Sequence, residues 1–159
     1  MKAAKGFTLI ELLIVMVILA IITTLAVPGF GRLIEGNRLV SGSNLLISSA
    51  KFARTEAIKR GSAVTLSTSG LAGGWCVHDG DDSGSCAADQ IRSFESPGRL
   101  TFSPNAAFDL VFDRRGFLAS GVGPITVEPD NCASGEVDRL RTINISPVGR
   151  VEVSRGDCP

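Results

Sequence analysis

The sequence predicts an α+β protein in which one long N-terminal helix leads into an antiparallel β-sheet domain. Three observations predict it: an apolar run over residues 7–27, apolar residues at helical spacing up to Gly61, and short β-prone segments separated by glycine and proline from Ser62 onward. A chain of 159 residues has room for such a helix and for one globular domain.

The apolar run from Phe7 to Val27 has the length of a membrane-spanning helix. Its 21 residues would form a helix of about 30 Å, the thickness of a bilayer core. A cleaved secretory signal has a shorter apolar region, and Pro28 makes a poor cleavage site. A helix of a small domain's core would carry a polar face, whereas this run is apolar all round, so that alternative fits worst. Because Lys2 and Lys5 precede the run, the positive-inside rule places the N-terminus in the cytoplasm and the rest of the chain outside.

Glu11 is the charged residue within this run. Placing a carboxylate within a membrane-spanning helix costs on the order of 3 kcal/mol of insertion free energy, so Glu11 needs a partner or a role. If the chain is cut after Gly6, Phe7 acquires a free amine about 6 Å of helix rise from Glu11. That amine on one subunit would neutralise Glu11 on a neighbour and would set the stagger between packed helices, a register role for a buried ion pair.

The helical pattern continues beyond Pro28 to Gly61, a natural C-cap. The residues of its apolar face are Leu39, Leu46, Ala50, Ala53 and Ala57. The basic residues expected on other faces are Lys51, Arg54, Lys59 and Arg60. Several glycines between 29 and 42 weaken the helix by about 1 kcal/mol each relative to alanine, so we expect this stretch to be pliable. The second half of the helix should lie across the sheet.

Eight short strands are expected after the helix. They are Ala63–Ser67, Trp75–Val77, Ile91–Phe94, Leu100–Ser103, Phe108–Phe112, Ile125–Val127, Thr142–Ser146 and Val151–Ser154. Because they are short and close together in the sequence, an antiparallel sheet is expected rather than a parallel one.

The charge balance argues against a general nucleic-acid-binding protein. Lys+Arg and Asp+Glu are each 16, and removal of residues 1–6 leaves 14 basic and 16 acidic side chains. Nucleic-acid-binding domains usually carry a clear basic surplus. The sequence also lacks G-x-S-x-G, H-E-x-x-H and P-loop motifs, so we predict no enzymatic activity and no cofactor. The single histidine, His78, is expected in a loop.

The N-terminal string Gly6-Phe7-Thr8-Leu9-Ile10-Glu11, followed by an apolar helix and Pro28, resembles the signature of type IV pilins and pseudopilins. The resemblance implies that a prepilin peptidase cuts between Gly6 and Phe7 and methylates the new amine of Phe7. It also implies that Glu11 directs insertion of the subunit into a growing filament.

Later segments resemble the family that holds the H-type minor pseudopilins of type II secretion and the FimT/FimU minor pilins. The segments are Ala53–Ile58, Gly73–Val77, Leu110–Phe112 leading to Gly116, Ile143–Ser146 and Gly149-Arg150. The resemblance implies a type IV pilin-like fold in a bacterial inner-membrane protein. The implied divisions are a cleaved leader over 1–6, a transmembrane and filament-packing helix over 7–28, an amphipathic half-helix over 29–61 and a periplasmic β-rich domain over 62–159.

The resemblance also implies partners: other pilins or pseudopilins contacted through the N-terminal helix, the prepilin peptidase, and the assembly machinery of the inner membrane. A minor component of this kind is expected near the filament tip, where it helps to start assembly. The resemblance implies either a type IV pilus or a type II secretion pseudopilus, and the stretch Arg38–Gly42 and a disulfide at the C-terminus resemble pilus members slightly more.

The four cysteines all follow the apolar run, as expected for disulfides in an oxidising compartment. A tetrahedral metal site would usually show C-x-x-C pairs, which are absent. Proximity in sequence favours the pairs Cys76–Cys86 and Cys132–Cys158, although four cysteines allow three connectivities.

Two surface features are candidates for binding. The loop bearing Asp79, Asp81 and Ser83 has calcium-loop spacing, but its twelfth position is Gln90 where a bidentate glutamate is required, so a solvated acidic loop is favoured over a metal site.

The second feature is a group of arginines, Arg139, Arg141 and Arg150, of which the first two are expected on one strand face as a phosphate-binding stripe. Some FimT-like relatives act in DNA uptake. DNA-binding relatives tend to carry a basic residue where this chain has Glu152, so a solvated surface is favoured over DNA binding.

Overall fold

The computed structural model describes residues 7–80 and 90–159, except for the side chains of 25–29. One helix, α1 (Leu9–Arg60), contains 52 residues and continues through Pro28 and the glycines that follow it. The boundary between two compact units of the chain falls within this helix, between Glu35 and Gly36.

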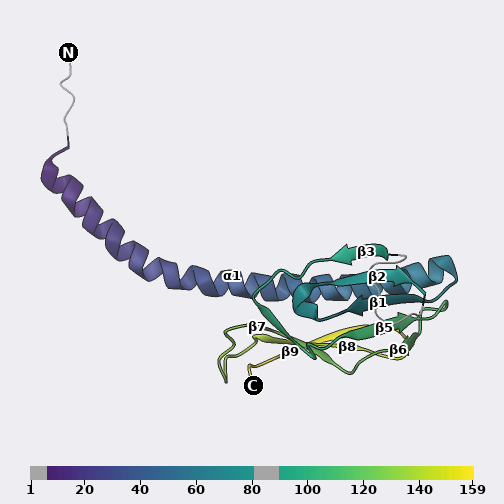
Figure 1. The fold of residues 1–159 in the computed structure, drawn as a ribbon. Helices are drawn as coiled ribbons and strands as arrows, with labels where there is room; N and C mark the ends of the chain where they lie inside the picture. The colour runs from purple at the N-terminus through teal and green to yellow at the C-terminus, as the bar shows by residue number, and fades with distance from the viewer. Residues whose placement is uncertain (1–6, 81–89) are drawn as a thin grey trace, which may run out of the picture. The chain divides into compact units, whose positions relative to one another are not determined.

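In the unit that begins at Gly36, the described residues form nine strands, most of which are labelled in Figure 1. They are β1 (Val64–Thr68), β2 (Trp75–Asp79), β3 (Gln90–Phe94), β4 (Leu100–Ser103), β5 (Phe108–Phe112), β6 (Leu118–Ser120), β7 (Ile125–Pro129), β8 (Leu140–Ile145) and β9 (Val151–Gly156). A 3-10 turn, η1 (Leu71–Gly73), joins β1 to β2. All eight predicted strands are present, and the short strand β6 was not predicted.

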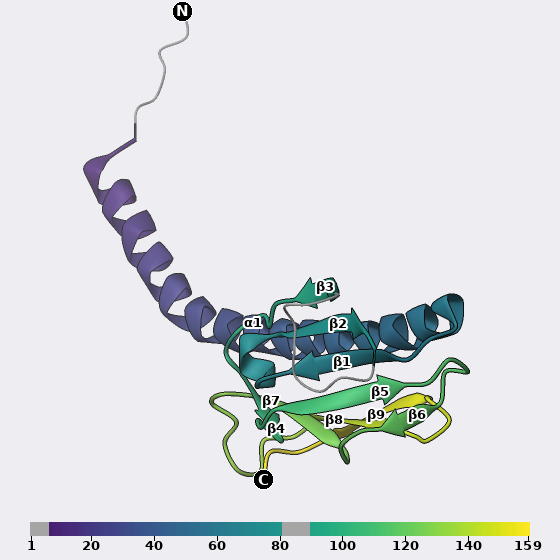
Figure 2. The same ribbon diagram turned by 45° about the vertical axis from the view of Figure 1, so that its right-hand side comes forward.

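The strands form two sheets where the sequence predicted one. The first has the order β3-β2-β1-β5-β6 and the second the order β4-β7-β8-β9, and every paired neighbour is antiparallel. Helix α1 runs alongside β1 and β2 in both views, and the second sheet lies below them (Figures 1 and 2). Buried residues alternate with more exposed ones along β4 and β7, so one face of the second sheet lies against the apolar core of the domain.

The predicted apolar face of the helix is confirmed. Leu39, Leu46, Ala50, Ala53 and Ala57 are all at most 2 % exposed. They pack in one cluster with residues of both sheets, including Leu66, Phe112, Phe102, Val127 and Ile143. The three alanines keep this face of the helix small, which lets the helix backbone approach the sheet closely.

Gly42 is a packing residue as well as a weak helix former. It is buried, and a Cβ added there would collide with Cδ1 of Leu100 and come within 3.2 Å of Pro97. The absence of a side chain at Gly42 therefore lets α1 lie directly against the start of β4.

Gly61 ends the helix as predicted. Its φ of +69° is left-handed, and its N–H donates to the carbonyl of Ala57 at 2.9 Å. Glycine adopts this conformation without the steric penalty of a Cβ, so the chain can leave the helix and enter β1 three residues later.

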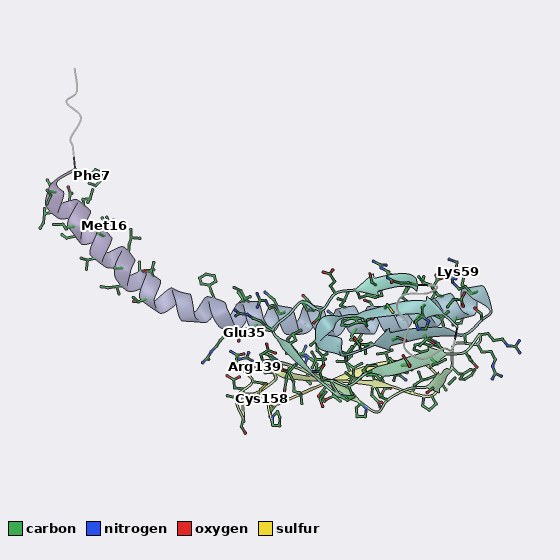
Figure 3. All side chains as sticks on the ribbon, in the orientation of Figure 1. Phe7, Met16, Glu35, Lys59, Arg139 and Cys158 are labelled. Carbon is green, nitrogen blue, oxygen red and sulfur yellow. A yellow bond between two sulfur atoms is a disulfide. The ribbon has the colours of Figure 1, made fainter. Side chains whose placement is uncertain are left out.

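The N-terminal half of α1 is apolar on all sides. Every large apolar side chain from Phe7 to Ile22 is between 50 % and 86 % exposed, and Figure 3 shows such side chains around this part of the helix between Phe7 and Met16. Over residues 7–80 and 90–159, no helical segment combines the length and the apolarity that crossing a bilayer requires.

Candidate functional sites

The start of α1 is closed by a reciprocal hydrogen-bond pattern between Thr8 and Glu11. The Glu11 carboxylate accepts from the Thr8 N–H at 3.0 Å and from its hydroxyl at 3.1 Å, and the Glu11 N–H donates to Thr8 Oγ1 at 3.3 Å. This is a capping box, with Thr8 as the N-cap and Glu11 three residues later. Its signal, Thr-x-x-Glu before an apolar run, was readable in the sequence but was not used in the prediction.

The capping box gives Glu11 a partner within its own chain. Gly6, on the other side of the predicted cleavage point, lies outside the described residues. Cleavage there would leave Thr8 as the second residue of the mature chain, directly beside the new amine of Phe7. Amine, hydroxyl and carboxylate would then all be supplied by the first five residues.

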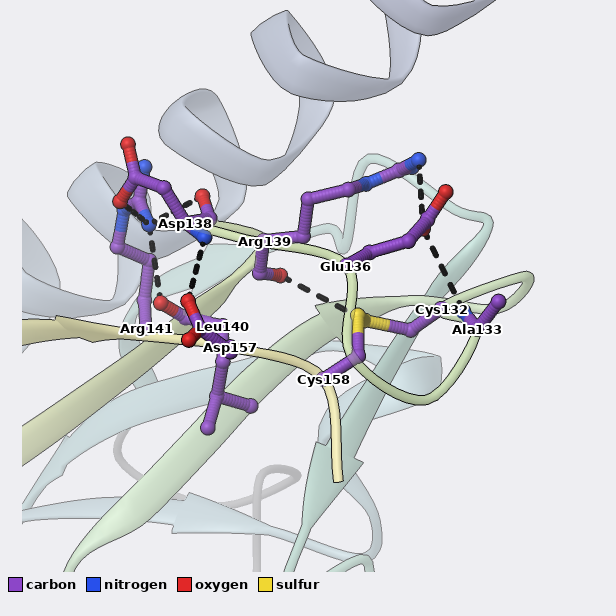
Figure 4. The surroundings of a disulfide bond; sticks show 9 residues. All are labelled: Cys132, Ala133, Glu136, Asp138, Arg139, Leu140, Arg141, Asp157 and Cys158. Carbon is purple, nitrogen blue, oxygen red and sulfur yellow. Dashed lines mark hydrogen bonds and ion pairs between the residues drawn. A yellow bond between two sulfur atoms is a disulfide. The ribbon is translucent and has the colours of Figure 1, made fainter.

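The predicted disulfide between Cys132 and Cys158 is present, with the two Cα atoms 5.6 Å apart (Figure 4). Backbone bonds on either side support it: Cys158 N–H donates to the carbonyl of Glu136 at 2.9 Å, and Gly135 N–H donates to the carbonyl of Cys158 at 3.1 Å. The disulfide therefore ties the C-terminus to the loop between β7 and β8. Cys86, the predicted partner of Cys76, lies outside the described residues, so that pair stays a prediction.

Arg139 and Arg141 do not form an exposed basic stripe. Arg139 precedes β8 and pairs with Glu136 at 3.0 Å, and Arg141 lies within β8 and pairs with Asp138 at 3.0 Å. Their side chains are only 17 % and 11 % exposed. Figure 4 shows both pairs beside the disulfide. The prediction that they share one strand face was wrong, because the strand begins at Leu140.

Arg150, the third predicted basic residue, lies in the turn between β8 and β9. Its side chain is 75 % exposed and pairs with Glu152 at 3.2 Å, on the surface of the domain. Each arginine of the predicted group thus has a carboxylate partner from its own chain.

Asp79, the first residue of the weak calcium candidate, is engaged in hydrogen bonds. Its two carboxylate oxygens accept from Arg60 at 3.1 Å, from the Ser62 hydroxyl at 2.9 Å and from the Gly80 N–H at 3.0 Å. These donors, led by Ser62, lower the pKa of Asp79. Asp81 and Ser83 lie outside the described residues.

His78 is a buried strand residue, so its prediction as a loop residue was wrong. It lies in β2, which is paired on both sides, and is 2 % exposed. Its ring Nε2 is 2.8 Å from Ser67 Oγ, and that hydroxyl donates to Asp109 at 2.5 Å. The other ring nitrogen, Nδ1, lies 3.2 Å from the Asp79 carbonyl, so both nitrogens of the buried imidazole have hydrogen-bonding partners.

Arg54 forms a junction that sequence reasoning missed. Its Nη1 donates to the carbonyl of Gly149 at 3.0 Å, while its Nε is buried and has no hydrogen-bond partner within residues 7–80 and 90–159. A Cβ at Gly149 would lie 2.9 Å from that Nε, and one at Gly116 would lie 3.0 Å from it. Three of the separated segments that carried the family resemblance therefore meet here: 53–58, Gly116 and Gly149-Arg150.

The comparisons with known families agree with this architecture. The family described as type II transport protein GspH matches residues 43–149, which is more than half of the chain. The chain belongs to the GspH family. The prokaryotic N-terminal methylation motif matches residues 1–27, the segment that contains Gly6, Phe7 and Glu11. No curated protein matches this chain.

Solved structures share the fold of this GspH-family chain. A crystal structure of the type IV minor pilin FimU of Pseudomonas aeruginosa strain PAO1 aligns with a TM-score of 0.60 and 24 % identity, over 76 % of this chain and 90 % of that one. A second crystal form of the same pilin aligns with a TM-score of 0.58 and 24 % identity, over 73 % of this chain and 92 % of that one. The α+β fold predicted from the sequence, with a long N-terminal helix on antiparallel strands, is confirmed.

Proposed function

We propose that this GspH-family chain is a minor pilin or pseudopilin that is processed at its N-terminus and then built into a filament, or primes its assembly. A prepilin peptidase cuts between Gly6 and Phe7 and methylates the Phe7 amine. Before assembly the chain is anchored in the bacterial inner membrane, with its N-terminus in the cytoplasm and its β-domain in the periplasm. The assembly machinery then transfers it into the filament.

The exposed apolar surface of residues 7–22 is the observation that carries this proposal. A soluble domain rarely exposes an apolar surface of this extent without a lipid or protein partner. The methylation motif over the same residues supports a partner that changes from lipid to other helices. The domain beyond Gly36 has its own buried core, so it does not need the N-terminal segment to bury its apolar residues.

Glu11 is proposed to set the register between neighbouring helices. In the single chain its carboxylate caps the helix through Thr8. In the filament the carboxylate would accept a second, charged partner, the Phe7 amine of a neighbour. A carboxylate can accept several hydrogen bonds, so the cap and the intersubunit pair are compatible.

Between the two filaments, the match of fold to minor pilins favours the type IV pilus and the family description favours type II secretion. The ion pairs of Arg139, Arg141 and Arg150 weigh against the alternative in which this surface binds DNA. A gel-shift assay at low salt is expected to show no retardation of duplex DNA by the purified chain.

Two variants separate the roles of the N-terminal residues. Glu11→Gln keeps an oxygen acceptor for the Thr8 N–H but removes the charge, whereas Thr8→Val keeps the charge and removes the hydroxyl. We expect both variants to be cleaved, with intact masses equal to residues 7–159 plus one methyl group. Only Glu11→Gln should fail to enter sheared filaments.

Recovery of the uncut chain from cells that contain a prepilin peptidase would contradict the processing step. Filaments that contain Glu11→Gln at the wild-type level would contradict the register role. If only Thr8→Val failed to enter filaments, the helix cap and not the charge of Glu11 would be what incorporation requires.

A further inference from the structure

The C-terminal half of α1 and the β8–β9 turn enclose a hollow of about 510 Å³ on the domain surface. Three cations contribute to its lining, Lys51 and Arg54 from the helix and Arg150 from the turn. Ile58 and Val151 supply apolar contact area beside them. All of these residues belong to the unit that begins at Gly36.

Of the three cations of this hollow, only Arg150 is paired with an acid in the part of the chain that the structure describes. Among the ion pairs of residues 7–80 and 90–159, none involves Lys51 or Arg54. Glu56, the nearest acid along the helix, pairs with Lys59 and Arg60. Arg150 pairs with Glu152, a contact at the surface where such pairs contribute little.

Arg54 is anchored in this site by one hydrogen bond of its guanidinium. Its Nη1 is bonded to the Gly149 carbonyl, and its Nε is buried near Gly116 and Gly149 without a hydrogen-bond partner among the described residues. A partly buried guanidinium that has no counter-ion and no full set of hydrogen bonds is costly. A bound anion would reduce that cost, and the fixed head group is already ordered to receive it.

We propose that this hollow is a carboxylate-binding site, and that its occupant is an acidic side chain presented by a neighbouring subunit. Its lining matches a side chain with an apolar stem against Ile58 and Val151, and a charged end between Lys51 and Arg54. Arg150 already holds a carboxylate in its pair with Glu152, so an incoming acid would share or replace that contact. That the occupant belongs to a neighbouring subunit rests on the proposed function. The carboxylate site itself rests only on the residues that line the hollow.

The site is tested by titrating the full chain in detergent micelles, at constant ionic strength, with a blocked Ala-Glu-Ala tripeptide. Parallel titrations use a blocked Ala-Gln-Ala tripeptide, inorganic phosphate and a duplex oligonucleotide. Binding is followed by the NMR signals of the Arg54 side-chain N–H and of the Gly149 and Arg150 amides. We expect the glutamate peptide to shift these signals in a saturable manner and the glutamine peptide to leave them unchanged.

Variants of exposed residues avoid disturbing the fold. Lys51→Gln combined with Arg150→Gln is expected to weaken glutamate-peptide binding by about tenfold, because two charged contacts are lost. Arg155→Gln is the matched control, because this exposed arginine also pairs with an acid but lies outside the hollow. It should bind the peptide as the wild-type chain does.

Absence of saturable shifts with the glutamate peptide, or equal binding by the double variant and the control, would overturn the site. Tighter binding of phosphate or duplex than of the glutamate peptide would overturn the carboxylate assignment. A double variant that binds no peptide yet enters filaments normally would overturn the neighbouring subunit as occupant. A chain that binds the peptide but is never built into filaments would leave the site standing and refute the proposed function.

Discussion

The indole Nε1 of Trp75 donates a hydrogen bond to the Ser49 hydroxyl at 2.6 Å, and this bond joins the C-terminal half of α1 to the first residue of β2. Both residues are buried. The Ser49 hydroxyl donates in turn to the carbonyl of Leu46 at 2.8 Å, so it satisfies two polar groups at once. A serine on the buried helix face thus fixes how the helix lies on the sheet.

Ser49→Ala is expected to destabilise the domain by about 1–3 kcal/mol, because it leaves the Trp75 N–H buried without an acceptor. The measurement is thermal or urea unfolding of the full chain in detergent, followed by tryptophan fluorescence, since Trp75 is the single tryptophan. Ser48→Ala is the matched control: Ser48 is exposed and makes a similar bond to Leu45. Equal effects of the two changes would show that the indole bond contributes nothing.

Two helix glycines should respond oppositely to alanine. Gly36→Ala is expected to stabilise the helix by about 1 kcal/mol, because alanine is the better helix former and nothing lies within 4 Å of the added Cβ. Gly42→Ala is expected to destabilise by about 1–3 kcal/mol, because the Cβ would collide with Leu100. Urea unfolding measures both. A stabilised Gly42→Ala would mean that the contact with β4 relaxes at no cost.

Local periodicity was enough to predict the helix face and the main strands. Spacing alone placed Leu39, Leu46 and Ala50 on one face, because a helix in contact with a sheet must turn the same side inward at every turn. Strand β6 was missed because it is three residues long, with two of them exposed, and it carries no alternating pattern.

Non-local contacts explain the errors in the predicted sites. Arg139 and Arg141 look like a basic stripe when their own strand is read alone, but acids in the preceding loop neutralise them. The buried ring of His78 bonds to Ser67, 11 positions away, and Ser67 in turn donates to Asp109, 42 positions further along the chain from Ser67. Helical spacing placed Arg54 off the apolar face, but it could not show the contacts with Gly116 and Gly149, which lie far ahead in the sequence.

Removal of the disulfide by the paired change Cys132→Ser with Cys158→Ser should lower the free energy of unfolding by about 3 kcal/mol. The two cysteines are separated by 26 residues, and closing a loop of that length restricts the unfolded chain by about this amount. Hydrogen exchange should rise first at the Gly135 and Cys158 amides, whose bonds join the C-terminus to the loop. Unchanged exchange at both amides would show that backbone bonds hold this end without the disulfide.

The acid sensitivity of the domain should depend on Glu56, near the C-terminal end of α1. Its carboxylate accepts from Arg60 at 3.0 Å, and this bond is the main reason that the pKa of Glu56 lies below its ordinary value. Arg60 also bonds to Asp79, whose pKa is likewise lowered. The three side chains therefore link the end of the helix to the end of β2.

A carboxylate with a lowered pKa in the folded state contributes stability that is present above its unfolded pKa and is lost as the pH falls through the folded value. Between about pH 5 and about pH 3, the melting temperature of the wild-type chain should therefore fall more steeply than that of Glu56→Gln. Near pH 7 the variant should be the less stable of the two, and the difference should shrink as the solution is acidified. Parallel curves for the two proteins over this range would show that the Glu56–Arg60 bond does not couple protonation to folding.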